Sequence, residues 1–309
     1  MRMVTQRDFG GPDVLEVVDV ERPEPGPTEV LVRVRAAGVN PVDFKSRAQE
    51  VFLGRPPYTV GWDVSGVIEA TGFGASSLRV GDEVFGMPWF PRQARAYGEY
   101  VTAPSRQFLR KPTELSHVEA AGLPLAGLTA WQALVDIAQV REGQRVLVDA
   151  AAGGVGHLAV QIAKAHGAHV IGTARAAKHD FLRSLGVDEP IDYTATDVGS
   201  AVQDVDVAIG LIGPENDLRL LRTLRADGLL IAVPGGVSES VAAEADRLGV
   251  LTREILVEPD QVGLRGLVGL VRSGQLRVHV SETFPLDQVA TAHEHGESGR
   301  TTGKIVLTL

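Results

Sequence analysis

An apolar run followed at once by a glycine-rich turn is the feature of this sequence that most constrains its fold. The run Arg145-Val146-Leu147-Val148-Asp149 leads into Ala150-Ala151-Ala152-Gly153-Gly154-Val155-Gly156. This layout is typical of a dinucleotide-binding strand–turn–helix unit, because glycines let backbone N–H groups approach a pyrophosphate and the helix N-terminus adds partial positive charge. We therefore expect Gly153, Gly154, Val155 and Gly156 to bind a cofactor. Ala151 stands where the first glycine of G-x-G-x-x-G belongs, so an ordinary tight turn is the alternative.

The residues after the turn complete this unit. Apolar side chains recur at helical spacing at Val155, Leu158, Ala159, Ile162 and Ala163. Gly167 marks the predicted helix end, and residues 169–173 predict a second strand. Thr173, at the end of that strand, is expected in the cofactor site.

The end of the second strand predicts which dinucleotide binds. An acidic residue about 20 positions after the glycines would bind the ribose 2′-hydroxyl of NAD. Here the chain continues as Thr173-Ala174-Arg175-Ala176-Ala177-Lys178, with two cations and no carboxylate. Because Arg175 and Lys178 would attract a 2′-phosphate, the sequence favours NADPH over NADH. The alternative is that both are solvated residues at a helix start.

Size and charge limit the classes of protein to which the chain can belong. It has 309 residues, enough for two domains, and 44 % of them are hydrophobic. No apolar run reaches the roughly 20 residues of a membrane span, and residues 1–8 lack the apolar core of a signal peptide. The net charge of −9 disfavours nonspecific binding to nucleic acid or to anionic membranes. We expect a cytoplasmic protein that binds neither.

The potential metal ligands are few. The chain has no cysteine, which excludes disulfides, zinc–thiolate sites and a cysteine nucleophile. The eight histidines show no ligand spacing, and His293 and His295, two positions apart, would point to different faces of a helix. We interpret the histidines as surface groups and predict no metal site.

The pattern of predicted helices and strands changes near Glu114. Before it, residues 30–35 alternate as a half-buried strand, and residues 58–71 and 80–85 predict further short strands. After it, residues 116–121 and 128–138 predict helices, and strands at 146–149, 169–173, 205–209 and 229–233 alternate with helices, as in a parallel sheet. Gly235 follows the last of these strands and is a further cofactor candidate, because ligands bind at the carboxyl ends of parallel strands. A helix over 261–273 and a strand over 303–307 end the chain.

Six segments carry a family likeness. They are residues 37–43 (Ala-Gly-Val-Asn-Pro-Val-Asp), 57–66 (Pro-Tyr-Thr-Val-Gly-Trp-Asp-Val-Ser-Gly), 80–85 (Val-Gly-Asp-Glu-Val-Phe), 127–131 (Gly-Leu-Thr-Ala-Trp), 152–156 (Ala-Gly-Gly-Val-Gly) and 298–307 (Ser-Gly-Arg-Thr-Thr-Gly-Lys-Ile-Val-Leu). In this order they resemble the medium-chain dehydrogenase/reductase superfamily and, within it, the zinc-independent NADPH:quinone oxidoreductase (zeta-crystallin-like) branch.

The resemblance implies an α/β fold in which a Rossmann doubly wound parallel sheet is joined to a β-rich GroES-like catalytic domain. The catalytic domain would comprise residues 1–115 together with 266–309, and the NADPH-binding domain residues 116–265. The active site would lie between them, and the protein would be a homodimer. Asn40 and Trp62 stand at two positions that hold zinc in the metal-dependent relatives, so the resemblance also implies metal-free chemistry.

Three residues are the candidate catalytic groups. Asn40 is expected to orient substrate or nicotinamide through its amide, and a turn residue before Pro41 is the alternative. Asp43 is expected to support Asn40 or Lys45, or to be a surface carboxylate. Tyr58 is expected to donate its phenolic O–H to a substrate oxygen, or to pack as an aromatic plug.

The resemblance assigns three more residues to the cofactor site. Thr129 matches a threonine beside the nicotinamide half, Tyr193 an adenosine-side position, and Lys304 a cofactor-contacting lysine. Phe52 stands near the position of a tyrosine found in some enoyl-thioester reductases of the branch. Phe52 and Trp62 would form an apolar platform for a flat acceptor, or pack in the core. The loop from Met87 to Ala96 is expected to shape the mouth of the substrate site.

The function expected is hydride transfer from NADPH to a small-molecule quinone or α,β-unsaturated carbonyl, since an acceptor that is already electron-poor needs no Lewis acid. Preorganised donors would stabilise the charge on the carbonyl oxygen. Reduction of an enoyl thioester, bound to coenzyme A or a carrier, is the second hypothesis. A non-catalytic NADPH-binding sensor, or a crystallin-like structural protein, is the third.

Overall fold

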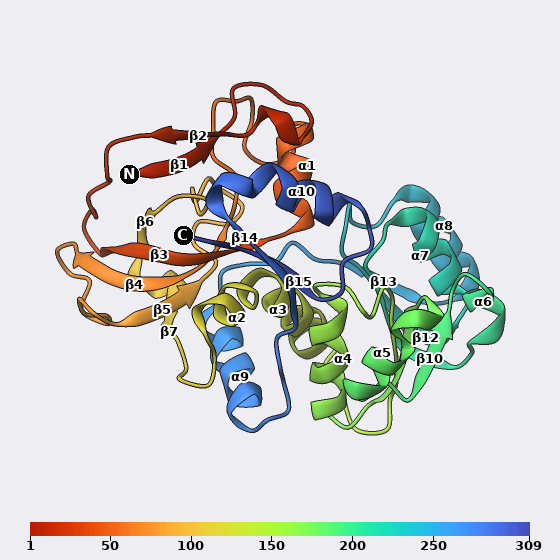
Figure 1. The fold of residues 1–309 in the computed structure, drawn as a ribbon. Coiled ribbons are helices and arrows are strands. Elements are labelled where there is room, and N and C mark those ends of the chain that lie inside the picture. The colour runs from red at the N-terminus through yellow and green to blue at the C-terminus, as the bar shows by residue number, and fades with distance from the viewer. The chain divides into compact units, whose positions relative to one another are not determined.

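The computed structural model describes residues 1–309, which form two compact units (Figure 1). Unit 1 comprises Met1–Leu128, Glu258–Arg272 and Val278–Leu309, and unit 2 comprises Thr129–Val257 and Ser273–Arg277. No helix is both long and apolar enough to cross a membrane.

Unit 2 is built on six parallel strands in the order β10-β9-β8-β11-β12-β13. Their bounds are β8 Arg145–Val148, β9 His169–Ala174, β10 Glu189–Asp192, β11 Val205–Gly210, β12 Leu224–Ala232 and β13 Leu251–Glu254. The helices between them are α4 Gly156–Ala165, α5 His179–Ser184, α6 Val198–Ala201, α7 Pro214–Leu221 and α8 Glu239–Leu248. The chain order reverses between β8 and β11, where doubly wound sheets bind their ligands. The predicted α/β class with a parallel sheet is therefore confirmed.

Local sequence predicted four of these six strands and missed two. β8, β9, β11 and β12 coincide with predicted apolar runs, although β12 begins five residues before its run. The missed β10 has only four residues and contains Pro190. The missed β13, at the sheet edge, reads Leu-Thr-Arg-Glu. Such short polar strands carry no hydrophobic periodicity, and only pairing with a neighbour defines them.

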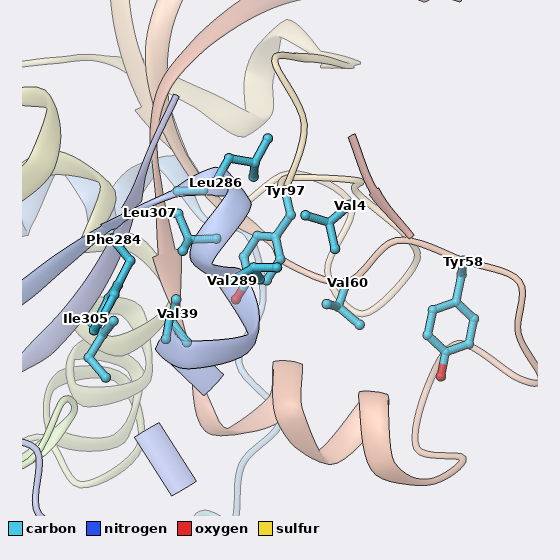
Figure 2. Packing of buried hydrophobic residues seen from close by; sticks show 12 residues of the cluster. Val4, Val39, Tyr58, Val60, Tyr97, Phe284, Leu286, Val289, Ile305 and Leu307 are labelled. Atoms are coloured by element: carbon cyan, nitrogen blue, oxygen red, sulfur yellow. The ribbon is translucent and has the colours of Figure 1, made fainter. Parts of the chain in front are cut away.

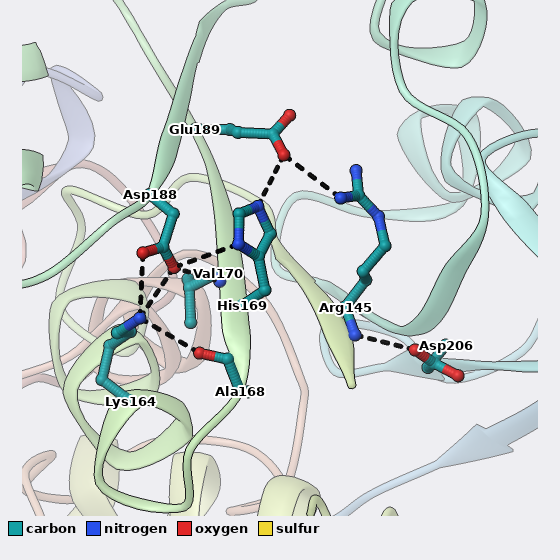
Figure 3. A network of polar contacts seen from close by, with 8 residues as sticks. All are labelled: Arg145, Lys164, Ala168, His169, Val170, Asp188, Glu189 and Asp206. Carbon is teal, nitrogen blue, oxygen red and sulfur yellow. Dashed lines mark hydrogen bonds and ion pairs between the residues drawn. The ribbon is translucent and has the colours of Figure 1, made fainter. Parts of the chain in front are cut away.

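Hydrogen bonds and ion pairs of polar side chains connect the amino ends of four of these strands (Figure 3). His169 Nε2, from the first residue of β9, donates to Glu189 of β10 at 2.5 Å, and Arg145 of β8 binds the same carboxylate at 3.2 Å. The backbone N–H of Arg145 donates to Asp206 of β11 at 2.7 Å. Lys164 of α4 pairs with Asp188 at 2.8 Å. These ion pairs lie at the end of the sheet opposite the glycine turn, so they stabilise the scaffold away from the candidate site.

Unit 1 contains a seven-stranded sheet centred on β3, which spans Glu29–Val39. The strand order is β14-β15-β3-β4-β5-β7, and β6 also pairs with β3. The other bounds are β4 Asp63–Thr71, β5 Glu83–Gly86, β6 Tyr100–Pro104, β7 Phe108–Arg110, β14 Val280–Pro285 and β15 Lys304–Thr308, with a separate hairpin of β1 Arg2–Thr5 and β2 Glu16–Asp19. The helices are α1 Pro41–Ala48, α2 His117–Ala121, α9 Gln261–Arg272 and α10 Val289–Glu297. A further helix, α3 (Pro124–Trp131), begins in unit 1 and ends in unit 2, where it continues as a π-helical segment over Gln132–Ile137.

The pairing of β15 with β3 brings the end of the chain beside residue 40. Ile305 pairs with Val39, and Leu307 pairs with Ala37. Figure 2 shows Val39, Ile305 and Leu307 packing with Val289 of α10 in one buried apolar cluster. Helix α10 contacts both β15 and α1. Because Ile305 lies opposite Val39, the start of β15 meets the start of α1.

Candidate active site

The glycine turn of unit 2 is held by the ends of β8 and β9. Ala150 has a positive φ of 44°, and Gly153 N–H donates to its carbonyl at 2.8 Å. A Cβ on Gly156 would lie 2.3 Å from that same carbonyl oxygen, so only glycine permits helix α4 to start this close to the strand end. The left-handed residue is thus an alanine, one position before the expected glycine.

Thr173 is part of this turn. Its hydroxyl accepts from the Ala150 N–H at 3.0 Å and donates to Asp149 at 2.7 Å. Its side chain is buried, and it joins β9 to the turn after β8. The observed bonds give Thr173 a structural function, and a direct cofactor contact stays a prediction.

Three predicted cofactor residues gather beyond the carboxyl ends of β9 and β10. Arg175 Nε donates to the Tyr193 phenol at 3.2 Å, and both side chains are exposed. Partial burial and the nearby Arg175 charge lower the pKa of Lys178. Asp192 is also near, but its carboxylate accepts from the hydroxyl of Thr194 at 2.7 Å and from its N–H at 2.9 Å. The arrangement gathers two cations and a phenol beyond the ends of β9 and β10, with the Asp192 carboxylate close to Arg175.

Two further cofactor candidates also lie in unit 2. Gly235, in the loop after β12, has a φ of +84° and open space where a Cβ would be. Thr129 lies in α3 and is 4 % exposed. Their contacts with a cofactor stay predictions.

In unit 1, Asn40 lies at the centre of a buried polar cluster. Lys304 Nζ donates to Asn40 Oδ1 and, at 3.0 Å, to the Val39 carbonyl. Asn40 Nδ2 donates to Asp63 at 2.9 Å, and the Leu125 N–H donates to the other carboxylate oxygen at 2.8 Å. Lys304 Nζ is 3.8 Å from Asp63, and both side chains are almost completely buried. The structure thus brings together two predicted site residues from opposite ends of the chain.

Burial dominates the electrostatics of this cluster. It raises the pKa of Asp63 to about 6, opposed by the Lys304 charge and the Asn40 hydrogen bond. It also lowers the pKa of Lys304, because an ammonium group loses hydration in the core. The same effect raises the pKa of Asp43 to about 7, although the Asn40 N–H and the Tyr97 phenol oppose it.

Asp43 is the N3 residue of a capping box on α1. Its Oδ2 accepts from the backbone N–H of Asn40, the N-cap, at 2.7 Å. The expected support of Asn40 by Asp43 is therefore present, and the surface alternative is wrong because Asp43 is 0 % exposed.

Tyr58 is 5 % exposed, and its hydroxyl donates to the Ser46 carbonyl at 2.6 Å. Its ring packs edge-on against Phe9, with centroids 6.5 Å apart. Because the only donor of Tyr58 is engaged by a backbone carbonyl, this geometry favours a packing role for its ring over hydrogen bonding to a substrate oxygen. The donor role stays a prediction.

Edge-to-face aromatic contacts join the two residues expected to form a platform. Phe90 contacts both, with ring centroids 5.8 Å from Phe52 and 5.2 Å from Trp62. Trp62 is fully buried and donates to the Arg92 carbonyl at 2.6 Å, whereas Phe52 is 41 % exposed. Trp62 is therefore a core residue, and Phe52 is the accessible one of the three rings. The loop between Met87 and Ala96 also lines a cavity of about 520 Å³ with Trp89, Gln93 and Arg95.

Sequence reasoning missed several members of the unit 1 network. Asp63 lies in the segment 57–66 that carries the resemblance, and Tyr97 follows the loop from Met87 to Ala96, but the sequence predicts no function for either residue. The interpretation of all histidines as surface groups is wrong for His293 and His157, which are 0 % exposed. No local signal distinguishes His293, because only the packing of its helix α10 on β15 and β3 buries it.

Comparison with known proteins identifies the family. Residues 26–113 match the alcohol dehydrogenase GroES-like domain, and residues 185–307 match a family model described as zinc-binding dehydrogenase. The chain is 34 % identical to a 2-haloacrylate reductase from Burkholderia sp, over 96 % of each protein. A quinone oxidoreductase structure from Coxiella burnetii superposes with a TM-score of 0.95 at 36 % identity, covering 100 % of this chain and 99 % of the other. The Escherichia coli quinone oxidoreductase complexed with NADPH gives 0.91 at 26 % identity, with full coverage of both chains.

These matches confirm the resemblance inferred from the six segments. The observed sheets agree with it, because a GroES-like match falls on unit 1 and a parallel doubly wound sheet forms unit 2. The chain belongs to the medium-chain dehydrogenase/reductase superfamily and, within it, to the quinone oxidoreductase branch.

Proposed function

We propose that this protein is an NADPH-dependent reductase that transfers a hydride to a quinone or an α,β-unsaturated carbonyl compound without a metal ion. The observation that carries the proposal is the buried Lys304–Asn40–Asp63 cluster, which holds the Asn40 amide in place from both sides, and an amide has a second N–H beside the one that donates to Asp63. Donors of this kind stabilise negative charge that develops on a substrate oxygen. The relatives named for quinone and 2-haloacrylate reduction act on electron-poor double bonds of this class.

The residues of unit 2 fit NADPH. The turn at Gly153–Gly156 leads directly into α4, and the partial positive charge at the N-terminus of this helix suits a pyrophosphate, although the His157 and Leu158 N–H groups already donate to the Gly153 and Val155 carbonyls. Arg175, Lys178 and Tyr193 offer cationic and phenolic donors for a 2′-phosphate. We assign cofactor binding to these residues with Thr129, Thr173, Gly235 and Lys304. The bound cofactor supplies the hydride.

Metal-free chemistry is favoured by the charge beside Asn40. The Lys304 ammonium already donates to the Asn40 amide oxygen, so a divalent cation at this position would meet a resident positive charge. Trp62, at the second ligand position of the metal-dependent relatives, is buried and uses its one polar atom on the Arg92 carbonyl. Neither side chain is arranged as a zinc ligand.

We further propose that residues 1–115 with 266–309 act as the catalytic domain and 116–265 as the cofactor domain, in a cytoplasmic homodimer. Each assignment has a direct test: limited proteolysis for the boundaries, light scattering for the dimer, and fractionation of the host cell for location.

The decisive experiment is spectrophotometric. NADPH oxidation is followed at one protein concentration over a panel of quinones, enones, enals and enoyl-CoA thioesters, with NADH in parallel. We expect turnover with quinones or enones and preference for NADPH. Turnover confined to enoyl-CoA would establish the thioester reductase instead. Retained NADPH binding without turnover on any acceptor would point to the sensor or structural protein.

A further inference from the structure

A second set of buried polar side chains is linked to Asn40 through Asp43 and is not used in the proposed reaction. Tyr97 and His293 are 0 % exposed, and Arg47 is 2 % exposed. Tyr97 precedes β6, His293 belongs to α10, and Arg47 belongs to α1. Burial of a polar side chain costs free energy unless the side chain is hydrogen-bonded. These three side chains find hydrogen-bond partners in one another.

These side chains form a chain of hydrogen bonds whose direction is determined at one end. Arginine has only donors, so the contact of 3.3 Å between Arg47 Nη1 and His293 Nδ1 requires that Nδ1 accept. The neutral ring then carries its hydrogen on Nε2, which is 3.4 Å from the Tyr97 oxygen. With its oxygen accepting from His293, the Tyr97 hydroxyl donates to Asp43 Oδ2 at 2.9 Å.

The two ends of the chain are anchored differently. Arg47 Nη2 pairs with Glu297 of α10 at 2.6 Å, so its position is fixed by an ion pair that reaches the surface. At the other end, Asp43 Oδ2 accepts both the Tyr97 hydroxyl and the Asn40 N–H, whereas Oδ1 is buried without a partner. The Asp43 carboxylate therefore depends on these two donors.

We propose that Tyr97, His293 and Arg47 are positioning residues that keep the Asp43 carboxyl ionised and so hold Asn40 in its working orientation. The catalytic consequence rests on the proposed function of Asn40. The structural part, that the tyrosine sets the ionisation of Asp43, stands independently of any substrate.

The charges around Asp43 give the sign of the effect. Burial raises its pKa to about 7, the Asn40 N–H and the Tyr97 hydroxyl oppose this, Asp63 of β4 raises the pKa, and Lys304 of β15 lowers it. His293 stays neutral, because burial and the Arg47 charge lower its pKa to about 3. Removal of the Tyr97 hydroxyl therefore raises the pKa of Asp43 further, and more alkaline conditions are needed to ionise it.

The test is the pH profile of kcat/KM for Tyr97→Phe, with the best acceptor from the panel. Loss of one hydrogen bond to a charged group corresponds to a shift of about one pH unit, so the acidic limb should move alkaline by that amount. Activity should fall severalfold at pH 6.5 and recover toward the wild-type value at pH 9. Tyr100→Phe, on β6 under the Arg22 guanidinium, is the matched control and should leave the limb in place.

A second readout needs no activity. Infrared titration of the cofactor-free protein detects the C=O stretch of a protonated carboxyl, and Asp43→Asn identifies the band. The pH midpoint of this band should rise in Tyr97→Phe and should rise by less in His293→Leu. The second variant serves as the test if Tyr97→Phe does not fold. An unmoved midpoint would overturn the proposal even in an active enzyme. A moved midpoint in a protein inactive on every acceptor would uphold it while refuting the proposed function.

Discussion

Arg175 Nε donates to the phenol oxygen of Tyr193 at 3.2 Å, and this bond joins the ends of the neighbouring strands β9 and β10. Tyr193 thereby orients a guanidinium that would otherwise move freely at the surface. The pair and Lys178 form a cationic group beyond the ends of these strands. Cofactor preference can therefore be tested by substitution here.

The double substitution Arg175→Ala and Lys178→Ala should raise KM for NADPH about a hundredfold and leave KM for NADH nearly unchanged. Two charge-assisted contacts to the 2′-phosphate, together worth on the order of 3 kcal/mol, account for the factor. Steady-state kinetics with both cofactors measure it. Arg183→Ala, which removes an exposed cation paired with Asp180 on α5, is the control. Equal wild-type affinity for the two cofactors would refute the assignment.

Gly156→Ala should weaken NADPH binding at least tenfold and lower the free energy of unfolding by about 2 kcal/mol. The added Cβ would lie 2.3 Å from the Ala150 carbonyl, so the turn must shift away from its close approach. Fluorescence titration with NADPH and urea unfolding measure the two effects. Gly269→Ala is the comparison, because a Cβ at that helical position meets nothing within 4 Å. Normal binding by Gly156→Ala would show that the turn tolerates a side chain.

The sequence predicted the glycine turn and its flanking elements correctly because their signals are local. Residues 145–173 contain the strand, the turn, the helix and the next strand in order, and each is defined by near neighbours. The Asn40 cluster is different, because its members lie up to 264 residues apart and meet only through the register of β15 on β3. Motif resemblance pointed to Asn40 and Lys304 separately, but not to their contact.

Tyr97 and His293 could not be predicted for a related reason. Tyr97 is placed by an irregular loop, and His293 is buried because α10 packs its apolar face on β15 and β3. A histidine in such a helix has the same local pattern whether its neighbours are solvent or a buried tyrosine. Tertiary packing alone determines the difference.

Lys304→Met should lower the free energy of unfolding by about 3 kcal/mol, because it leaves the buried Asp63 carboxylate without its cation. Addition of Asp63→Asn should recover at least half of this loss, since the uncompensated charge is then gone. Urea denaturation of the two single variants and the double variant gives the coupling energy. Additive losses would show that the two groups do not interact. Both Lys304 variants should also reduce kcat, since the donor to Asn40 is absent.

Asp217→Asn should stabilise the protein at pH 8 and leave its stability at pH 4 nearly unchanged. Asp217, on α7, is 0 % exposed, and neither carboxylate oxygen has a hydrogen-bond partner. Burial, with a smaller contribution from the Asp149 charge, raises its pKa to about 6. The folded state therefore holds this proton more tightly than the unfolded chain, whose aspartates titrate near pH 4. As pH rises from about 4 through 6, the wild type loses stability that a neutral amide does not lose, about 3 kcal/mol in total. Urea unfolding at pH 4, 6 and 8 measures the difference, with the fully exposed Asp180→Asn as control. If the free energies of unfolding of the wild type and of Asp217→Asn change in parallel across this range, Asp217 is ionised in the folded protein without a loss of stability.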